Sequence, residues 1–107
     1  MSQRKKQIRV NFRNAVLQRG KHCCRTCGCP HDVLDVHHIT DRNEMPNGGY
    51  VPENGISVCH RCHQLAEIYH STGGVKWYTG LHPNDLYRLI GSSKELAIQA
   101  SEKLFNT

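Results

Sequence analysis

The sequence predicts a small α+β domain stapled by a four-cysteine zinc site, with a basic helix before this core and further helices after it. At 107 residues and 37% hydrophobic, the chain buries only a small core, so a staple is expected. Two C-x2-C pairs have the spacing of zinc ligands. Some segments alternate apolar and polar residues, as strands do, and others repeat apolar residues at helical spacing. Turn residues separate these segments, so strands and helices are expected together in one domain over residues 1–107.

The basic N-terminal segment is expected to form a helix from about residue 4 to 19. Its apolar residues recur at the spacing of one helix face, and Gly20 follows as a stop signal. These apolar residues are Ile8, Phe12, Ala15 and Val16. We expect this stripe to pack against the core.

The core itself is expected over about residues 22–73. Alternation predicts one strand at 33–39 and another at 56–58. The segment 41–55 between them is rich in Gly, Pro and Asn, which predicts a loop. A helix is expected from Cys62 to about Thr72, where glycines follow as its C-terminal stop.

The C-terminal segment is expected to hold helices over about residues 84–105. A short helix near 84–90 stops at Gly91. Ser92 and Glu95 have the spacing of a capping box, which predicts the start of a last helix that runs toward Phe105.

The paired cysteines are Cys24, Cys27, Cys59 and Cys62. Thiolates at this spacing chelate one tetrahedral zinc ion, and the glycine after Cys27 permits the tight turn of a zinc knuckle. Disulfides are an alternative, but no apolar run follows Met1 to suggest secretion, so structural zinc in a reducing cytoplasm is favoured. A redox-active dithiol fits two matched pairs less well. Cys23 and Cys29 have no partners at useful spacing and are expected to be ordinary side chains or bystander thiols.

Adjacent histidines, His37 and His38, lie in the first predicted strand. Their side chains therefore point to opposite faces, and we expect them to have different roles. His63 follows the second cysteine pair, where the helix can offer a ligand to an ion held by the strand. Glu67 and His70 share this helix face, so either is a candidate third ligand.

Positive charge is concentrated at the N-terminal end. Eight Lys or Arg residues precede the first acidic residue, Asp32, in a chain of net charge +5. A basic end of this kind favours a polyanion such as DNA as the partner, although a basic terminus that serves only solubility is an alternative. The candidate phosphate contacts are Lys5, Lys6, Arg9, Arg42 and Arg61. No stretch approaches the roughly 20 apolar residues that a membrane-spanning helix needs, so no membrane partner is expected.

The order of these motifs resembles the HNH endonucleases. The motifs are C-x2-C-G, D-V-H-H-I, E-N-G-I-S-V and C-x2-C-H, and they extend over about residues 24–70. The resemblance implies a ββα-metal finger, with His37 and His63 as ligands to a catalytic divalent ion. It also implies His38 as the general base and Asn54 as the residue that fixes the loop. Gly55 stands where many members have Leu, which alters the start of the second strand.

The implied activity is metal-dependent hydrolysis of phosphodiester bonds in DNA. A neutral histidine such as His38 can take the proton of a water molecule near neutral pH, and the ion acts as a Lewis acid on the phosphate. Many relatives have Asp where His37 stands, and the colicin-type nucleases have His. The ion is therefore left open between magnesium, manganese, nickel and zinc. A single site in a short chain favours nicking by a monomer, with a weak dimer as the alternative.

Two other function classes remain open from the sequence. A zinc-ribbon module would bind nucleic acid through the same cysteines and basic helix without cutting it. A recruitment factor would dock a larger DNA-processing machine through its C-terminal helices. Small HNH proteins of this build resemble those that bacteriophages encode beside genome-packaging genes, which implies terminase proteins as partners and the host cytoplasm as the location.

Overall fold

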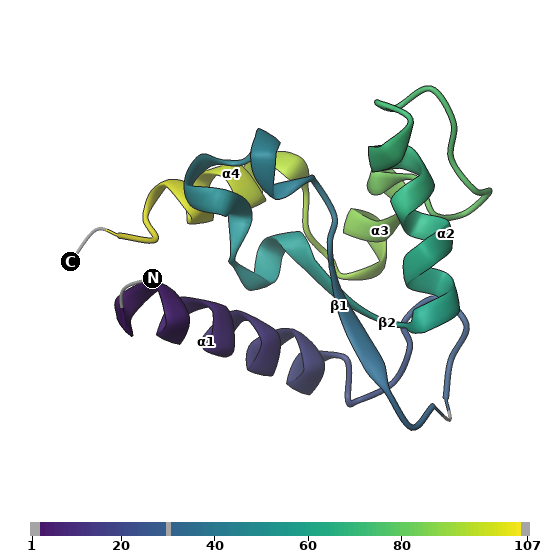
Figure 1. The fold of residues 1–107 in the computed structure, drawn as a ribbon, viewed down its shortest axis with the longest axis horizontal. Helices are drawn as coiled ribbons and strands as arrows, with labels where there is room; N and C mark the ends of the chain where they lie inside the picture. The colour runs from purple at the N-terminus through teal and green to yellow at the C-terminus, as the bar shows by residue number, and fades with distance from the viewer. Residues whose placement is uncertain (1–2, 30, 106–107) are drawn as a thin grey trace.

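The computed structural model describes residues 3–29 and 31–105. Its helices and strands are α1 (Gln3–Arg19), β1 (Leu34–His38), β2 (Gly55–Cys59), α2 (His60–Ser71), α3 (Pro83–Leu89) and α4 (Lys94–Glu102). The two strands form an antiparallel sheet, with α1 on one side and α2 on the other (Figure 1). This arrangement confirms the predicted α+β fold class.

The register of the sheet places the paired histidines beside the start of β2. His37 lies opposite Ile56, and His38 lies opposite Gly55. At the other end of the sheet Leu34 lies opposite Cys59, which leads directly into α2. One strand pair therefore links the histidines at one end to the cysteines at the other.

Helix α1 packs on the sheet because β2 begins with a glycine. Phe12 and Val16 are buried, and a Cβ atom at Gly55 would lie only 2.7 Å and 2.6 Å from their side chains. Arg19 strengthens this contact by donating hydrogen bonds to the carbonyl oxygens of Pro52 and Gly55. Gly55 is thus what lets the basic helix approach β2.

The segment between the strands is more ordered than the predicted loop. It contains three short 3-10 helices: η1 (Arg42–Glu44), η2 (Pro46–Gly49) and η3 (Pro52–Asn54). Helix α4 packs against η2 and η3, and Asn47 donates a hydrogen bond to the carbonyl of Ser101 at 2.9 Å. The C-terminal helix therefore holds the connection that carries Asn54.

The start of α4 corrects one prediction by a residue. Ser93, and not Ser92, is the N-cap, because its hydroxyl oxygen accepts a hydrogen bond from the Leu96 N–H at 3.1 Å. Ser92 instead donates to the carbonyl of Glu53 at 2.9 Å. The predicted capping box of Ser92 and Glu95 is therefore wrong. Either serine could have capped the helix from the sequence alone. The hydrogen bond of Ser92 to Glu53 in η3 leaves Ser93 as the N-cap.

The hydrophobic core lies between the sheet, α2 and the C-terminal helices. Its fully buried side chains include Ile39, Ile56, Val58 and Leu86. Helix α2 begins at His60, two residues before the predicted start. Within the described residues no helix combines the length and apolar character that crossing a membrane requires.

Candidate active site

Two tight turns bring the paired cysteines together. The Cys27 N–H points to the Cys24 sulfur at 3.4 Å, and the Cys62 N–H points to the Cys59 sulfur at 3.5 Å. Gly28 follows the first pair with a φ of 94°, a conformation that glycine adopts without strain. The Cys27 sulfur lies 3.4 Å from that of Cys24 and 3.8 Å from that of Cys59.

These sulfurs have the chemistry of a structural zinc site. Burial alone would raise the pKa of Cys24, but hydrogen bonds from Thr26 and from backbone N–H groups lower it to about 5. Cys24 is therefore the thiol of the cluster that ionises most readily, whereas the hydrogen bond to Cys24 raises the pKa of Cys27 and burial raises the pKa of Cys62. A set of soft sulfur ligands selects zinc over magnesium or calcium. The predicted four-cysteine cluster could therefore hold zinc.

His31 is a further candidate ligand that the sequence reasoning did not identify. Its Nε2 atom lies 3.2 Å from the Cys27 sulfur. One group of potential ligand atoms comprises those of Cys24, Cys27, His31 and Cys59, all within 4.8 Å of one another. Cys62 lies beside this group, where its thiol interacts with the other three cysteines. The sequence signal that could have identified His31 is its position four residues after Cys27, a C-x3-H spacing.

The structure corrects the prediction for the two remaining cysteines. Cys23 and Cys29 form a disulfide, with their Cα atoms 5.0 Å apart. The reason is the hairpin of the first knuckle, in which Cys24 and Gly28 pair as in an antiparallel bridge. Residues 23 and 29 flank this bridge and are therefore brought opposite each other, although their spacing alone suggested no partner.

His37 points from β1 toward α2. It is 1% exposed, and its ring centroid lies 5.2 Å from the centroids of both His63 and His70. Its Nδ1 atom lies 3.2 Å from a carboxylate oxygen of Glu67, but without hydrogen-bond geometry. This buried nitrogen therefore has no hydrogen-bond partner within the part of the chain that the structure describes.

His37, Glu67 and His70 form the second group of potential metal ligands. Their ligand atoms all lie within 4.8 Å of one another. His70 contacts the His38 carbonyl through Nε2 at 3.0 Å, and its buried Nδ1 has no partner among the described residues. Two buried imidazole nitrogens without partners beside a carboxylate fit a divalent cation. Without a bound ion, each nitrogen has lost its contact with water and gained no partner in exchange.

His63, the second ligand implied by the family resemblance, lies at the edge of this group. Its Nε2 atom is 3.4 Å from the same Glu67 oxygen, and its Nδ1 atom is 2.9 Å from Asp35. The His37 imidazole, whose Nδ1 lies 3.2 Å from the carboxylate, is the main reason why the pKa of Glu67 is lowered to about 2. The site therefore presents an ionised carboxylate among three imidazoles.

His38 occupies the opposite face of β1. Its ring lies between those of Phe12 and Tyr50, at centroid distances of 4.9 Å and 4.8 Å. Burial, and secondarily the charges of His37 and Arg42, lower the pKa of His38 to about 4. Its Nε2 atom has no hydrogen-bond partner within the described chain. The imidazole is therefore neutral at neutral pH and has an unpartnered nitrogen that can accept a proton, although the lowered pKa makes it a weaker base than an exposed histidine.

Asn54 is fully buried and connects the loop to the end of β1. Its side-chain oxygen accepts hydrogen bonds from the Thr40 N–H at 3.0 Å and the Tyr87 hydroxyl at 2.7 Å. Its amide donates to the carbonyls of Thr40 and Gly49 at 3.1 Å and 3.3 Å. The side chain thereby fixes the backbone two residues beyond His38.

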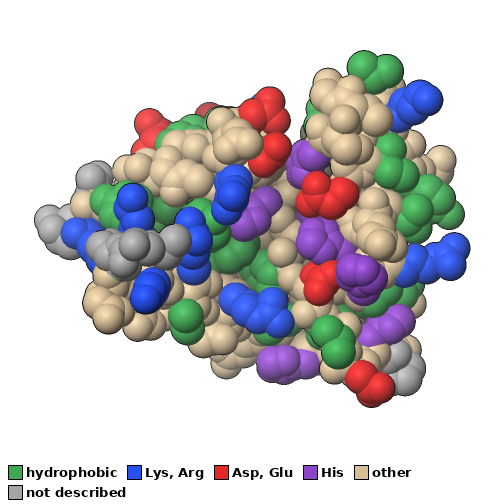
Figure 2. Space-filling model, in the orientation of Figure 1, with side chains coloured by type: hydrophobic (Ala, Val, Ile, Leu, Met, Phe, Trp, Pro, Cys, Tyr) green, Lys and Arg blue, Asp and Glu red, His purple; other side chains and the backbone are tan. Residues whose placement is uncertain are grey.

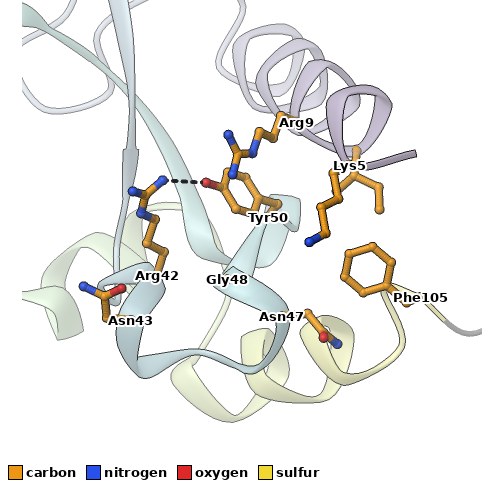
Figure 3. A pocket seen from close by; sticks show the side chains of 9 residues that line it. Lys5, Arg9, Arg42, Asn43, Asn47, Gly48, Tyr50 and Phe105 are labelled. Atoms are coloured by element: carbon orange, nitrogen blue, oxygen red, sulfur yellow. Dashed lines mark hydrogen bonds between the residues drawn. The ribbon is translucent and has the colours of Figure 1, made fainter. Parts of the chain in front are cut away.

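Three of the five predicted phosphate contacts lie together. Lys5, Arg9 and Arg42 line one hollow between α1 and η1 (Figure 3). Lys6 is exposed on α1 outside this lining, and Arg61 lines a separate hollow near the cysteines. Figure 2 shows Lys and Arg side chains gathered over the side of the molecule where α1 lies.

Comparison with known proteins identifies the segment that carries these groups. Residues 24–67 match the family model described as HNH endonuclease. No curated protein and no solved structure matches the chain. The family generally comprises endonucleases, so the match indicates a nuclease or nucleic-acid-binding role. The matched segment spans both cysteine pairs, His37, His38 and Asn54, and this part of the chain is therefore similar to the HNH endonucleases.

Proposed function

We propose that the protein is a metal-dependent DNA endonuclease that hydrolyses phosphodiester bonds by nicking. The observation that carries this proposal is the distribution of histidines over the two faces of β1. His37 joins the group of potential metal ligands on one face, and His38 presents a neutral imidazole on the other. A nuclease of this kind needs both a cation site and a separate proton acceptor.

His38 is the general base in this proposal. Its Nε2 atom accepts the proton of the attacking water, and Phe12 and Tyr50 hold the ring in place. Asn54 is a positioning residue, because its four hydrogen bonds fix the backbone at Thr40 and Gly49. Arg42 is near enough to lower the pKa of His38 and can also attract the scissile phosphate.

His37 and His63 are the proposed ligands to the catalytic ion, with Glu67 and His70 completing the set. The donors are imidazole nitrogens and one carboxylate, which suit manganese, nickel or zinc and, through the carboxylate, magnesium. A bound ion supplies Lewis-acid relief of charge on the phosphate and its leaving oxygen. The cysteine cluster holds structural zinc in the same proposal.

Supercoiled plasmid DNA tests the proposed activity. The zinc-loaded protein is incubated with plasmid and magnesium, manganese, nickel or zinc in turn, and the products are separated on an agarose gel. We expect open circles to form before linear DNA with at least one ion, because one active site cuts one strand. Plasmid that stays supercoiled with every ion, although the protein binds it, would favour the zinc-ribbon binding module.

We further propose that the protein acts in phage genome processing. Leu89 on α3 and Leu96 on α4 are exposed apolar side chains on the C-terminal helices, which supports docking to a larger protein. We propose a terminase protein in the host cytoplasm as that partner. Co-elution with a purified terminase subunit in size-exclusion chromatography, lost in a Leu89→Asp and Leu96→Asp double variant, tests this role.

A further inference from the structure

A hollow of about 380 Å³ lies beside the proposed general base. Its walls come from the start of α1, from η1 and η2, and from the end of the chain after α4 (Figure 3). Tyr50 joins the hollow to the active site, because its ring centroid lies 4.8 Å from that of His38. A group bound in the hollow would thus sit next to the reacting phosphate.

The hollow is built to hold an anion. Lys5, Arg9 and Arg42 contribute to its lining, and none of the described residues that line it is acidic. Arg9 lies over the face of Tyr50 at 5.0 Å, and Arg42 donates a hydrogen bond to the Tyr50 hydroxyl at 2.9 Å. Both guanidinium groups are therefore held in position, which reduces the entropy lost when they bind a phosphate.

Two aromatic rings, those of Tyr50 and Phe105, line the hollow. Phe105 lies across the hollow from Tyr50, with the Lys5 side chain between them (Figure 3). Arg9 covers one face of Tyr50, and the rings of Phe12 and His38 meet Tyr50 at steep angles. Arg4 lies over one face of Phe105, 5.5 Å from the ring centroid, so a base would stack on the opposite face of Phe105.

A phosphate site combined with an aromatic ring matches the chemistry of a nucleotide. Bases stack on aromatic side chains whatever their sequence, and basic groups follow the backbone of the strand. A base inside a duplex has both faces covered by its neighbours, so only an unpaired base can stack on Phe105. A hollow of this size lies within the range that accommodates one small ligand and is too small for a duplex.

We infer that this hollow binds one unpaired nucleotide next to the scissile phosphate, with its phosphate on Arg9 and Arg42 and its base on Phe105. The inference rests on the proposed nuclease function and specifies its substrate class. Preferred substrates are DNA molecules with a single-stranded segment beside the cut, such as overhangs, flaps or gaps.

Fluorescence anisotropy tests this inference without any cleavage. The zinc-loaded protein is titrated into a labelled blunt duplex and into the same duplex with a single-stranded overhang, with no further divalent ion added. We expect the overhang to bind about tenfold more tightly, the size of one base stacked on an aromatic ring. Phe105→Ala should remove this preference, and Phe105→Tyr should retain it.

Tyr78→Ala is the matched control, because Tyr78 is an exposed aromatic residue beside the separate hollow near the cysteines. Equal affinity of the wild-type protein for both DNA molecules would overturn the inference, as would an equal loss of preference in Tyr78→Ala. These outcomes are independent of plasmid cleavage. A Phe105-dependent preference in a protein that relaxes no plasmid would overturn the proposed nuclease function alone.

Discussion

Asp35 orients His63: its carboxylate oxygen lies 2.9 Å from Nδ1 of His63, whose Nε2 then faces Glu67 at 3.4 Å. The acceptor fixes the tautomer with hydrogen on Nδ1, which leaves Nε2 as the atom able to bind a cation. Asp35 itself lies on β1, two residues before His37. One strand therefore supplies both a proposed ligand and the group that positions another.

We predict that Asp35→Asn weakens binding of the catalytic ion about 10- to 100-fold, the usual cost of losing such a supporting group. Isothermal titration of manganese or nickel into the zinc-loaded protein measures this effect. Asp32→Asn is the matched control, because Asp32 is exposed and lies outside the strand. Equal affinities in wild type and Asp35→Asn would show that His63 is not oriented by this contact.

His38→Ala should lower the cleavage rate about 100- to 10,000-fold, because the proton acceptor is lost. The variant should still bind DNA and keep its circular dichroism spectrum. The substitution changes neither the cysteines nor the basic side chains of the hollow lined by Lys5, Arg9 and Arg42, called the basic hollow below. Single-turnover plasmid cleavage at saturating protein measures the rate. Nicking at the wild-type rate would remove His38 from the mechanism.

Much of the fold could be predicted because local signals and burial agree. Phe12 and Val16 are buried at helical spacing on α1, and Gly20 follows the helix. The turn of the first cysteine pair was predictable because C-x2-C followed by glycine encodes its own geometry. Each of these signals acts within a few residues of the chain.

Contacts between distant segments could not be predicted from the sequence. The Tyr87 hydroxyl reaches Asn54 from α3, and nothing local to either residue indicates that contact. Periodicity placed Glu67 and His70 on the face of His63, but only packing on β1 shows that they lie closest to His37. The Cys23–Cys29 disulfide likewise depends on how the hairpin closes.

The two candidate metal sites should respond differently to mutation. Cys59→Ser or Cys24→Ala should lose zinc and unfold, because structural zinc contributes on the order of 10 kcal/mol or more in small domains. His63→Ala should keep its circular dichroism spectrum and lose cleavage. Zinc content by atomic absorption and thermal melting distinguish the two classes. Unfolding of all three variants alike would show that the two sites are not separate.

The hydrogen bonds of Asn54 should contribute strongly to stability. Asn54→Ala leaves the Thr40 N–H and two carbonyl groups without their partners, each at a cost of about 1 to 3 kcal/mol when buried. Tyr87→Phe removes the hydroxyl that donates to Asn54 and hydrogen-bonds to the Thr40 hydroxyl, and should cost less, about 1 to 2 kcal/mol. Urea denaturation of the zinc-loaded protein compares the two variants. Similar losses would mean that the loop is held by other contacts.

Replacing Lys5, Lys6 and Arg9 with Gln should weaken binding to DNA of any sequence. Each lost phosphate contact removes about 0.9 from the slope of log affinity against log salt concentration, because fewer counterions are released. Anisotropy titrations across a range of salt concentrations measure this slope. Lys76→Gln is the control, since Lys76 is exposed in the segment after α2, outside the basic hollow. A slope unchanged by the triple substitution would place the DNA elsewhere, along Arg42, Arg61 and the C-terminal helices.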